Sequence, residues 1–260
     1  MAMEAVDARW IVPDWPAPAR VRAICSTRAG GVSQAPYDSL NLGDHVGDAP
    51  DAVAANRQRF AAALQARPVF LSQVHGFGAV QLAADTPDAT PADGCIAAAP
   101  GVACTIMVAD CLPVLFTTAS GSAVAAAHAG WRGLAGDGAR GILEAVCEQL
   151  LRETGAAPSD VLAWLGPCIG PRMFEVGAEV KAAFEMKDPQ AGQLFRPRDD
   201  RKWLADLQGL ARRRLEALGV TQIYGNDGTD AWCTVSNPSR FFSYRRDRVC
   251  GRFAAAVWLA

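Results

Sequence analysis

Short apolar runs recur along the chain and predict more strands than helices. Runs of about four to eight residues rich in Val, Ile, Leu, Phe and Ala, bounded by Gly, Pro, Asn or Asp, are typical of buried strands. We therefore predict strands at residues 21–27, 69–74, 79–82, 102–108, 112–117, 123–127, 161–165 and 253–259.

Apolar residues at helical spacing predict helices between these strands. Ile142, Val146 and Leu150 fall on one face of the segment 138–154, whose other face is charged. A second helix is predicted to begin near Pro50 and to continue through Leu64. Two more are predicted at residues 177–185 and 204–218.

Two polar segments interrupt this pattern. Residues 28–48 form a long loop rich in Gly, Ser, Asn and Asp, and its interleaved apolar residues favour an ordered, functional loop. Residues 186–201 hold two prolines and are predicted to form a mobile loop. The strands come in groups rather than in strict alternation with helices. The fold class predicted is therefore α+β, with mixed β-sheets flanked by helices.

The length, composition and net charge of the chain limit its domain organisation, partners and location. A chain of 260 residues with 50% hydrophobic content can bury a large core, and with no repeat or linker we expect a single domain over residues 1–260. A net charge of -2 gives no overall attraction to nucleic acid or to anionic lipid. Without a signal peptide or an apolar stretch of about 20 residues, we expect a cytoplasmic protein with reduced cysteines, and a monomer is favoured.

Three residues that can bind a metal lie where apolar runs begin or end. Cys111 separates the runs 102–108 and 112–117, His128 follows the run 123–127, and His75 follows the run that begins at residue 69. Each has a glycine or proline within two residues, which lets backbone or substrate come close. Two histidines and one cysteine match the three protein ligands of a catalytic zinc site.

Other interpretations of the same residues stay open at this point. The two histidines could be hydrogen-bonded core residues and Cys111 a small core side chain. With Met107 nearby, the set also matches an electron-transfer copper site. A multicopper oxidase needs more imidazoles than the three histidines of the chain, since only His45 remains. In a cysteine hydrolase, Cys111 would be the nucleophile and His128 the base, with Asp110 or His75 orienting it.

A series of short blocks in chain order resembles the YfiH-type laccase-domain family. This family is also called peptidoglycan editing factor or laccase-domain purine nucleoside phosphorylase, and was formerly called multicopper polyphenol oxidase. The blocks are STRAGGVS (26–33), YDSLNLG (37–43), HVGD (45–48), QVHG (73–76), ADCLPV (109–114), HAGWRG (128–133), GPCIGP (166–171), FEV (174–176) and FFSYRRD (241–247). The chain departs from the family at Val235, where an aromatic residue often follows Cys-Thr.

The resemblance implies a fold, a metal and a reaction. The fold would consist of mixed sheets flanked by helices and would be similar to the catalytic domain of cytotoxic necrotizing toxins. His75, Cys111 and His128 would bind zinc in a surface pocket, with copper as the alternative ion. The activities implied are phosphorolysis of adenosine, inosine and methylthioadenosine to free base and (methylthio)ribose 1-phosphate, and deamination of adenosine. The alternatives are a copper-dependent polyphenol oxidase and a hydrolase that edits peptidoglycan precursors with Cys111.

For deamination, a carboxylate must carry protons, and Asp110 is the nearest candidate in sequence, followed by Glu175. Together with Cys111 and His128, Asp110 completes the predicted catalytic set.

For phosphorolysis, arginine side chains are suited to hold phosphate, and we expect Arg28, Arg132 and Arg245 to do so. Asn41 and His45, from the long loop, are expected to bind ribose or base, and Glu175 is also expected to be a substrate-binding residue. The expected partners are thus a purine nucleoside and phosphate, with no nucleic acid and no membrane.

Overall fold

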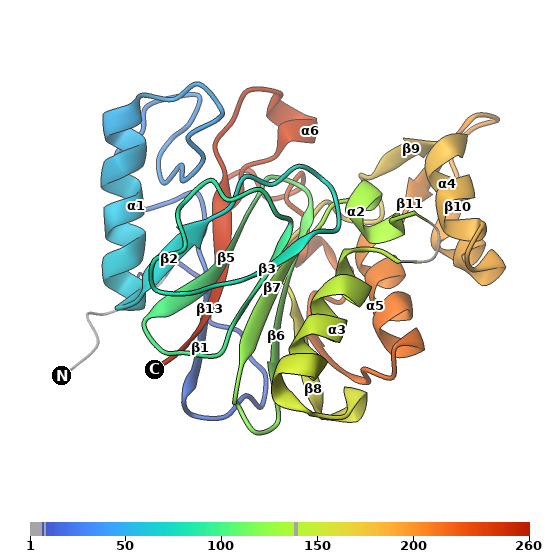
Figure 1. Ribbon diagram of the computed structural model, residues 1–260. Coiled ribbons are helices and arrows are strands. Elements are labelled where there is room, and N and C mark those ends of the chain that lie inside the picture. Colours follow the sequence, from blue (N-terminus) through green and yellow to red (C-terminus); the bar gives the residue numbers. More distant parts are fainter. Residues whose placement is uncertain (1–6, 8, 138–139) are drawn as a thin grey trace.

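Two β-sheets packed face to face form the centre of the computed structural model, which describes residues 7, 9–137 and 140–260 (Figure 1). The first sheet has four strands in the order β1 (Val21–Cys25), β13 (Phe253–Leu259), β5 (Val102–Val108) and β2 (Arg67–Phe70). The second has six, in the order β12 (Gln222–Gly225), β8 (Val161–Leu165), β6 (Leu112–Thr118), β7 (Val124–Ala129), β4 (Gly94–Ala97) and β3 (Ala79–Gln81). Both sheets mix parallel and antiparallel pairs, so the predicted α+β class is confirmed.

Strand β5 shows how the sequence pattern builds these layers. Cys104, Ile106 and Val108 face the second sheet, whereas Ala103 and Met107 face the other way. Side chains alternate between the faces of a strand, so a run that is apolar at every position is buried on both sides. The run 102–108, in which Thr105 is the one polar residue, is buried throughout and therefore lies in the middle of the molecule.

Helices cover the two outer faces and complete a four-layer sandwich (Figure 1). Helix α1 (Pro50–Leu64) packs Phe60 and Leu64 against the four-stranded sheet. Helices α3 (Ile142–Thr154) and α5 (Leu207–Ala217) cover the six-stranded sheet. The predicted helix over 138–154 thus ends as expected, while residues 138–139 lie outside the described residues.

The remaining elements lie mostly beside this sandwich. A small third sheet has the order β10 (Phe195–Pro197), β11 (Lys202–Ala205) and β9 (Glu175–Gly177). The short helices are α2 (Trp131–Ala135), α4 (Ala178–Glu185) and α6 (Tyr244–Asp247), and the 3-10 helices are η1 (Pro158–Asp160), η2 (Pro189–Leu194) and η3 (Asp230–Trp232). Among the residues that the structure describes, no helix is long and apolar enough to cross a membrane.

Several predicted boundaries were wrong. Strand β1 ends at Cys25 instead of residue 27, and α3 begins at Ile142 instead of residue 138. Strand β2 ends at Phe70 instead of residue 74, because residues 74–76 turn their backbone N–H groups toward the carboxylate of Asp93. The segment 186–201, predicted as a loop, contains η2 and β10. The helix predicted from residue 204 begins at Leu207, since residues 204 and 205 pair in β11 and the Asp206 side chain caps the helix by accepting from the Gly209 N–H (2.7 Å).

Candidate metal centre and its cavity

His75, Cys111 and His128 come together where the two large sheets are connected. His75 lies in the loop that follows β2 of the four-stranded sheet, and His128 lies on β7 of the six-stranded sheet. Cys111 occupies the turn from β5 to β6, which carries the chain from one sheet to the other. One candidate ligand atom from each of the three residues lies within 4.8 Å of the others. The sequence separations, 36 and 17 residues, do not by themselves predict that the three residues lie close together.

The three side chains leave room for an ion between them. Cys111 Sγ lies 3.9 Å from His75 Nε2, and the two imidazole rings meet edge to face with centroids 4.8 Å apart. His128 is buried, Cys111 is partly exposed and His75 is exposed, so the group opens to solvent on one side. Thiolate and imidazole are the ligands that zinc prefers in proteins, and copper accepts them as well.

Asp93 supports this group and was not among the predicted site residues. Its carboxylate is completely buried. Oδ1 accepts from His128 Nδ1 (2.8 Å) and from the His75 N–H (2.9 Å), and Oδ2 accepts from the Gly76 N–H (2.7 Å). Burial opposes ionisation, but the bond from His128 and the backbone N–H groups hold the pKa of Asp93 below its usual value. The signal in the sequence was an acid directly before the buried strand β4.

Charge couples Cys111 to the two histidines. Burial alone would raise the pKa of the Cys111 thiol, but His128 and then His75 lower it to about 6. Burial likewise opposes the charged form of His128, while Cys111 and Asp93 raise its pKa to about 9. Both shifts favour a thiolate beside an imidazolium when no metal is bound. The thiolate is the form of cysteine that binds metal ions and attacks carbon.

Asp110 holds the turn that presents Cys111. Its φ of 97° lies in the left-handed region, which is unfavourable for a residue with a side chain. Three hydrogen bonds fix it: Oδ1 accepts from Thr234 Oγ1 (2.6 Å), Oδ2 from the Arg245 N–H (2.6 Å), and the carbonyl from the Ile169 N–H (2.9 Å). Both carboxylate oxygens of the predicted proton carrier are thus engaged within the protein.

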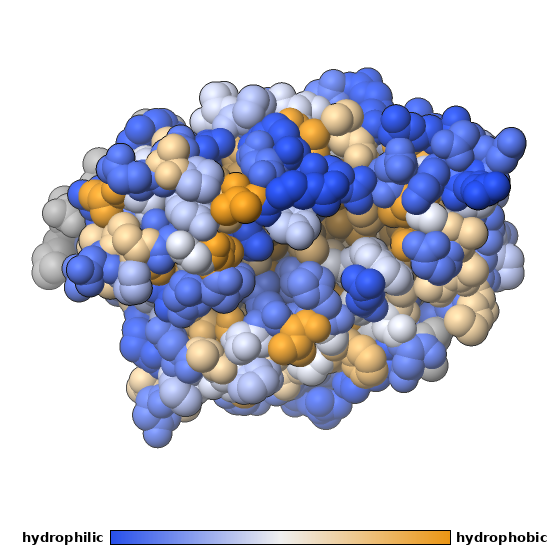
Figure 2. Space-filling view, turned by 90° about the horizontal axis from the view of Figure 1, so that it is seen from above, coloured by the Kyte–Doolittle hydropathy of each residue, from blue (hydrophilic) through white to orange (hydrophobic). Residues whose placement is uncertain are grey.

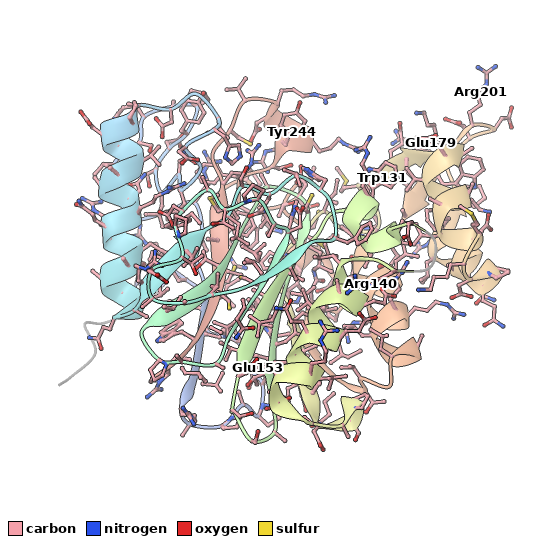
Figure 3. The ribbon with its side chains drawn as sticks, viewed as in Figure 1. Trp131, Arg140, Glu153, Glu179, Arg201 and Tyr244 are labelled. Carbon is pink, nitrogen blue, oxygen red and sulfur yellow. The ribbon has the colours of Figure 1, made fainter. Side chains whose placement is uncertain are left out.

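A cavity of about 490 Å³ opens beside the three candidate ligands. Figure 2 looks at the end of the molecule where α2 and α6 lie and shows it hollowed near the middle, with hydrophilic residues around the hollow. Trp131 from α2 and Tyr244 from α6, labelled in Figure 3, line the cavity from different elements. The other lining residues are His45, Gln73, Met107, Val108, Ala109, Asp110, Arg132, Ile169, Phe174, Leu207, Arg245 and Arg252, together with His75, Cys111 and His128.

Three of the predicted substrate residues line this cavity. Arg132 on α2 is exposed and stacks on the Trp131 ring at 4.5 Å. Arg245 on α6 donates from Nη1 to the carbonyl of Glu175 (3.0 Å), and His45 lies at the exposed rim. Arg252 is a further cation in the lining, which the sequence analysis missed because it stands alone between β13 and a glycine.

The other three predicted substrate residues do not line the cavity. Arg28 donates to the carbonyls of Asp38 (2.8 Å) and Pro238 (2.9 Å), which fastens the long loop. Asn41 is buried, and its Oδ1 accepts from the Arg252 N–H (2.8 Å). Glu175 points to Arg198, with which it forms an ion pair (2.5 Å). All three therefore hold loops or strands that surround the cavity.

Comparisons with known proteins cover nearly the whole chain. A family model described as multi-copper polyphenol oxidoreductase laccase matches residues 22–260. A purine nucleoside phosphorylase of Pseudomonas aeruginosa is 53% identical over 96% of this chain and 98% of its own length. The purine nucleoside phosphorylase YfiH of Escherichia coli is 48% identical over 97% and 99%.

Solved structures give the same match in three dimensions. YlmD from Geobacillus stearothermophilus superposes with a TM-score of 0.88 at 33% identity, covering 99% of this chain and 98% of that one. A Neisseria meningitidis protein assigned to the DUF152 family superposes with a TM-score of 0.86 at 44% identity, covering 96% and 99%.

Proposed function

Because this chain belongs to the laccase-domain family of YfiH-like proteins, we propose that it is a zinc-dependent purine nucleoside phosphorylase. Relatives that match it over nearly their full length are named purine nucleoside phosphorylases. One observation carries the proposal: a His-Cys-His group lies in the wall of a cavity that three arginines and a histidine also line. Such a cavity suits an anion next to a metal centre.

The residues present fit a zinc ion. His75, Cys111 and His128 would hold it, and Asp93 engages Nδ1 of His128, which leaves Nε2 of that ring for the metal. Three protein ligands leave one coordination position open, as in catalytic rather than structural zinc sites. When bound, zinc would supply a Lewis acid at this wall of the cavity.

The chain's own residues would bind and orient the two substrates. Phosphorolysis requires phosphate to be held against C1′ of the ribose, and Arg132, Arg245 and Arg252 supply positive charge and N–H donors for its oxygens. Phe174 and Trp131 supply aromatic surface for a purine ring. A volume of about 490 Å³ is within the usual range for a small-molecule site.

Deamination of adenosine is the second activity that we propose for this cavity. It needs a carboxyl group that carries protons, and among the described residues Asp110 is the one acid that lines the cavity. Its role would depend on release of one of its two hydrogen bonds, to Thr234 or to Arg245. Glu175, the other predicted carrier, lies in an ion pair outside the lining.

A specific arrangement also supports a second candidate function, a hydrolase with Cys111 as nucleophile. Cys111 would be the nucleophile and His128, which contacts it, the base, while Asp93 would orient His128. This reaction would run in the metal-free protein, whereas the phosphorylase would need zinc. A copper oxidase has less support, because His45 lies outside the three-residue group and adds no further imidazole to it.

The deciding experiment is incubation of zinc-loaded protein with adenosine, inosine or methylthioadenosine and phosphate. We expect free base and a ribose 1-phosphate, with inosine as an additional product from adenosine. Metal-free protein and Cys111→Ala should form none of them. If the loaded protein forms neither base nor inosine, the proposal fails. Hydrolysis of a peptidoglycan precursor by metal-free protein would favour the hydrolase, and copper-dependent phenol oxidation would favour the oxidase.

A further inference from the structure

Asp93 is a buried acid whose side chain serves only the candidate metal centre. The described residues place no lysine or arginine in hydrogen-bonding contact with its carboxylate, although a buried charge is costly without partners. Its partners are three consecutive backbone N–H groups, of Val74, His75 and Gly76, and the imidazole of His128. Every one of them belongs to a candidate ligand or to a residue next to one.

We propose that Asp93 is the positioning residue that assembles the metal centre, by fixing the backbone of one ligand and the tautomer of another. The inference rests on the proposed metal centre and goes beyond it, because it assigns a task to a residue that does not bind the ion. Oδ2 accepts from the N–H groups of Val74 and Gly76 and Oδ1 from that of His75, and these bonds fix the loop of His75. Oδ1 keeps the proton of His128 on Nδ1, so that Nε2 presents its lone pair to the metal.

This task needs two oxygens that only accept hydrogen bonds. An asparagine at position 93 has one such oxygen and one NH₂ group, which donates. If the NH₂ group replaced Oδ2, it would face the N–H groups of Val74 and Gly76, and the His75 loop would be released. If it replaced Oδ1, it would donate to Nδ1 of His128 and move the imidazole proton to Nε2, where it blocks the metal. Either orientation therefore removes one ligand.

The backbone of residue 93 is held independently of its side chain. The Asp93 carbonyl accepts from the His128 N–H (2.7 Å), and the Asp93 N–H donates to the Gly78 carbonyl (3.0 Å). These bonds keep the start of β4 in place beside β7 when the side chain changes. We therefore expect Asp93→Asn to fold and to lose metal affinity selectively.

The test compares cobalt(II) and zinc binding by wild type, Asp93→Asn and a control, Glu144→Gln. Glu144 is also buried and bonded, but its partner is Arg214 on α5 rather than a candidate metal ligand. We expect Asp93→Asn to bind either ion about 10- to 100-fold more weakly in chelator competition, with a changed thiolate-to-cobalt absorption band. Glu144→Gln should lower thermal stability and leave affinity and spectrum unchanged.

The outcomes separate this inference from the proposed function. If Asp93→Asn has the affinity and spectrum of wild type, the proposed role of Asp93 is overturned and the zinc-dependent function is not. If wild type binds neither ion, both this role and the zinc-dependent function fail. A measurement on wild type does not depend on how the variant folds: nitrogen NMR of zinc-loaded protein should show the His128 proton on Nδ1, and a proton on Nε2 would overturn the inference.

Discussion

Gly130 is the residue at which the backbone leaves space for two of the candidate metal ligands, His75 and Cys111. A Cβ atom built there would lie 3.0 Å from His75 Cδ2 and 3.1 Å from Cys111 Sγ. Its backbone angles, φ -67° and ψ 156°, suit any residue, so an alanine would act only through these two contacts. The glycine is therefore explained by the approach of two ligands, not by its own conformation.

We expect Gly130→Ala to weaken zinc binding by about tenfold, comparable to the loss of a supporting contact around a metal site. The methyl group would push His75 and Cys111 apart by a few tenths of an ångström. Isothermal titration with zinc gives the affinity. Gly78→Ala is the matched control, because a Cβ there meets nothing within 4 Å. Equal affinities of the two variants would contradict this account of Gly130.

Substitutions of Arg132 and Arg28 test which of the predicted phosphate-binding residues contacts the substrate. Arg132 is exposed in the cavity lining, whereas Arg28 is bonded to Asp38 and Pro238 and stacked on Phe242. A bond between charged groups contributes about 1.5 to 3 kcal/mol. We therefore expect Arg132→Ala to raise KM for phosphate about 10- to 100-fold with unchanged Tm. Arg28→Ala should lower Tm and leave KM for phosphate near wild type, and the reverse pattern would restore Arg28 as the phosphate ligand.

The residue scale also shows the limit of sequence reasoning about the site. His75, Cys111 and His128 could be proposed because each residue type has metal chemistry and each ends or begins an apolar run. Asp93 could not, because its role depends on β4 lying beside β7 and on the loop after β2, which are distant in sequence. Arg28 and Asn41 were predicted to bind substrate, and in the structure both anchor the long loop. A loop anchor and a ligand anchor use the same side-chain chemistry, so the sequence does not distinguish the two roles.

At the element scale, helices α3 and α5 are joined by a buried ion pair. Glu144 on α3 accepts from Arg214 Nε (2.9 Å) and from Lys187 Nζ (3.1 Å). Glu144 also accepts from the Gly141 N–H at the start of α3 (3.0 Å). Burial would raise the pKa of this carboxyl, but Arg214, a backbone N–H group and Lys187 together hold it below the ordinary value of 4.5.

This pair predicts a pH-dependent stability. A carboxyl with a depressed pKa stabilises the fold fully above its ordinary value, and the contribution is lost as pH falls through the folded-state pKa. Breaking a buried pair costs about 3 kcal/mol. We expect Glu144→Gln to lose about that free energy of unfolding at pH 7 in urea titrations, and the difference from wild type to shrink below pH 4.5. A difference that stays constant from pH 7 to pH 3 would contradict the assigned charge.

The predicted element boundaries were wrong where one polar side chain ends an element within an apolar run. The run 69–74 is apolar enough for a strand, yet β2 stops at Phe70, the Ser72 N–H donates to the Thr90 carbonyl, and the Asp93 carboxylate binds the N–H groups of residues 74–76. Residues 204 and 205 fit the helical spacing of residues 207–218, yet Asp206 begins α5 after them. The strands β5, β6 and β7 were placed correctly, since burial on both faces leaves a continuous apolar signal.

At the scale of the whole molecule, a metal bound by the three ligands would join the two large sheets. His75 follows a strand of the four-stranded sheet, His128 lies on the six-stranded sheet, and Cys111 lies in the turn between them. A ligand that binds only the folded state stabilises it by about 2.7 kcal/mol at a free concentration 100 times its Kd. For a chain of this size that corresponds to a rise in Tm of about 5 to 10 °C.

We therefore expect zinc to raise Tm by this amount and a chelator to reverse the rise, as followed by calorimetry. Because one core cluster holds residues of both sheets, such as Ile106 and Leu115, the sandwich should unfold in one transition with and without zinc, which would also support the prediction that residues 1–260 form one domain. Cys111→Ser removes the thiolate and should abolish the zinc-dependent rise, while Cys147→Ser, a change at a buried cysteine on α3, should keep it. Two separate transitions, of which zinc shifts only one, would show that the ion stabilises a single sheet and that the sheets unfold independently.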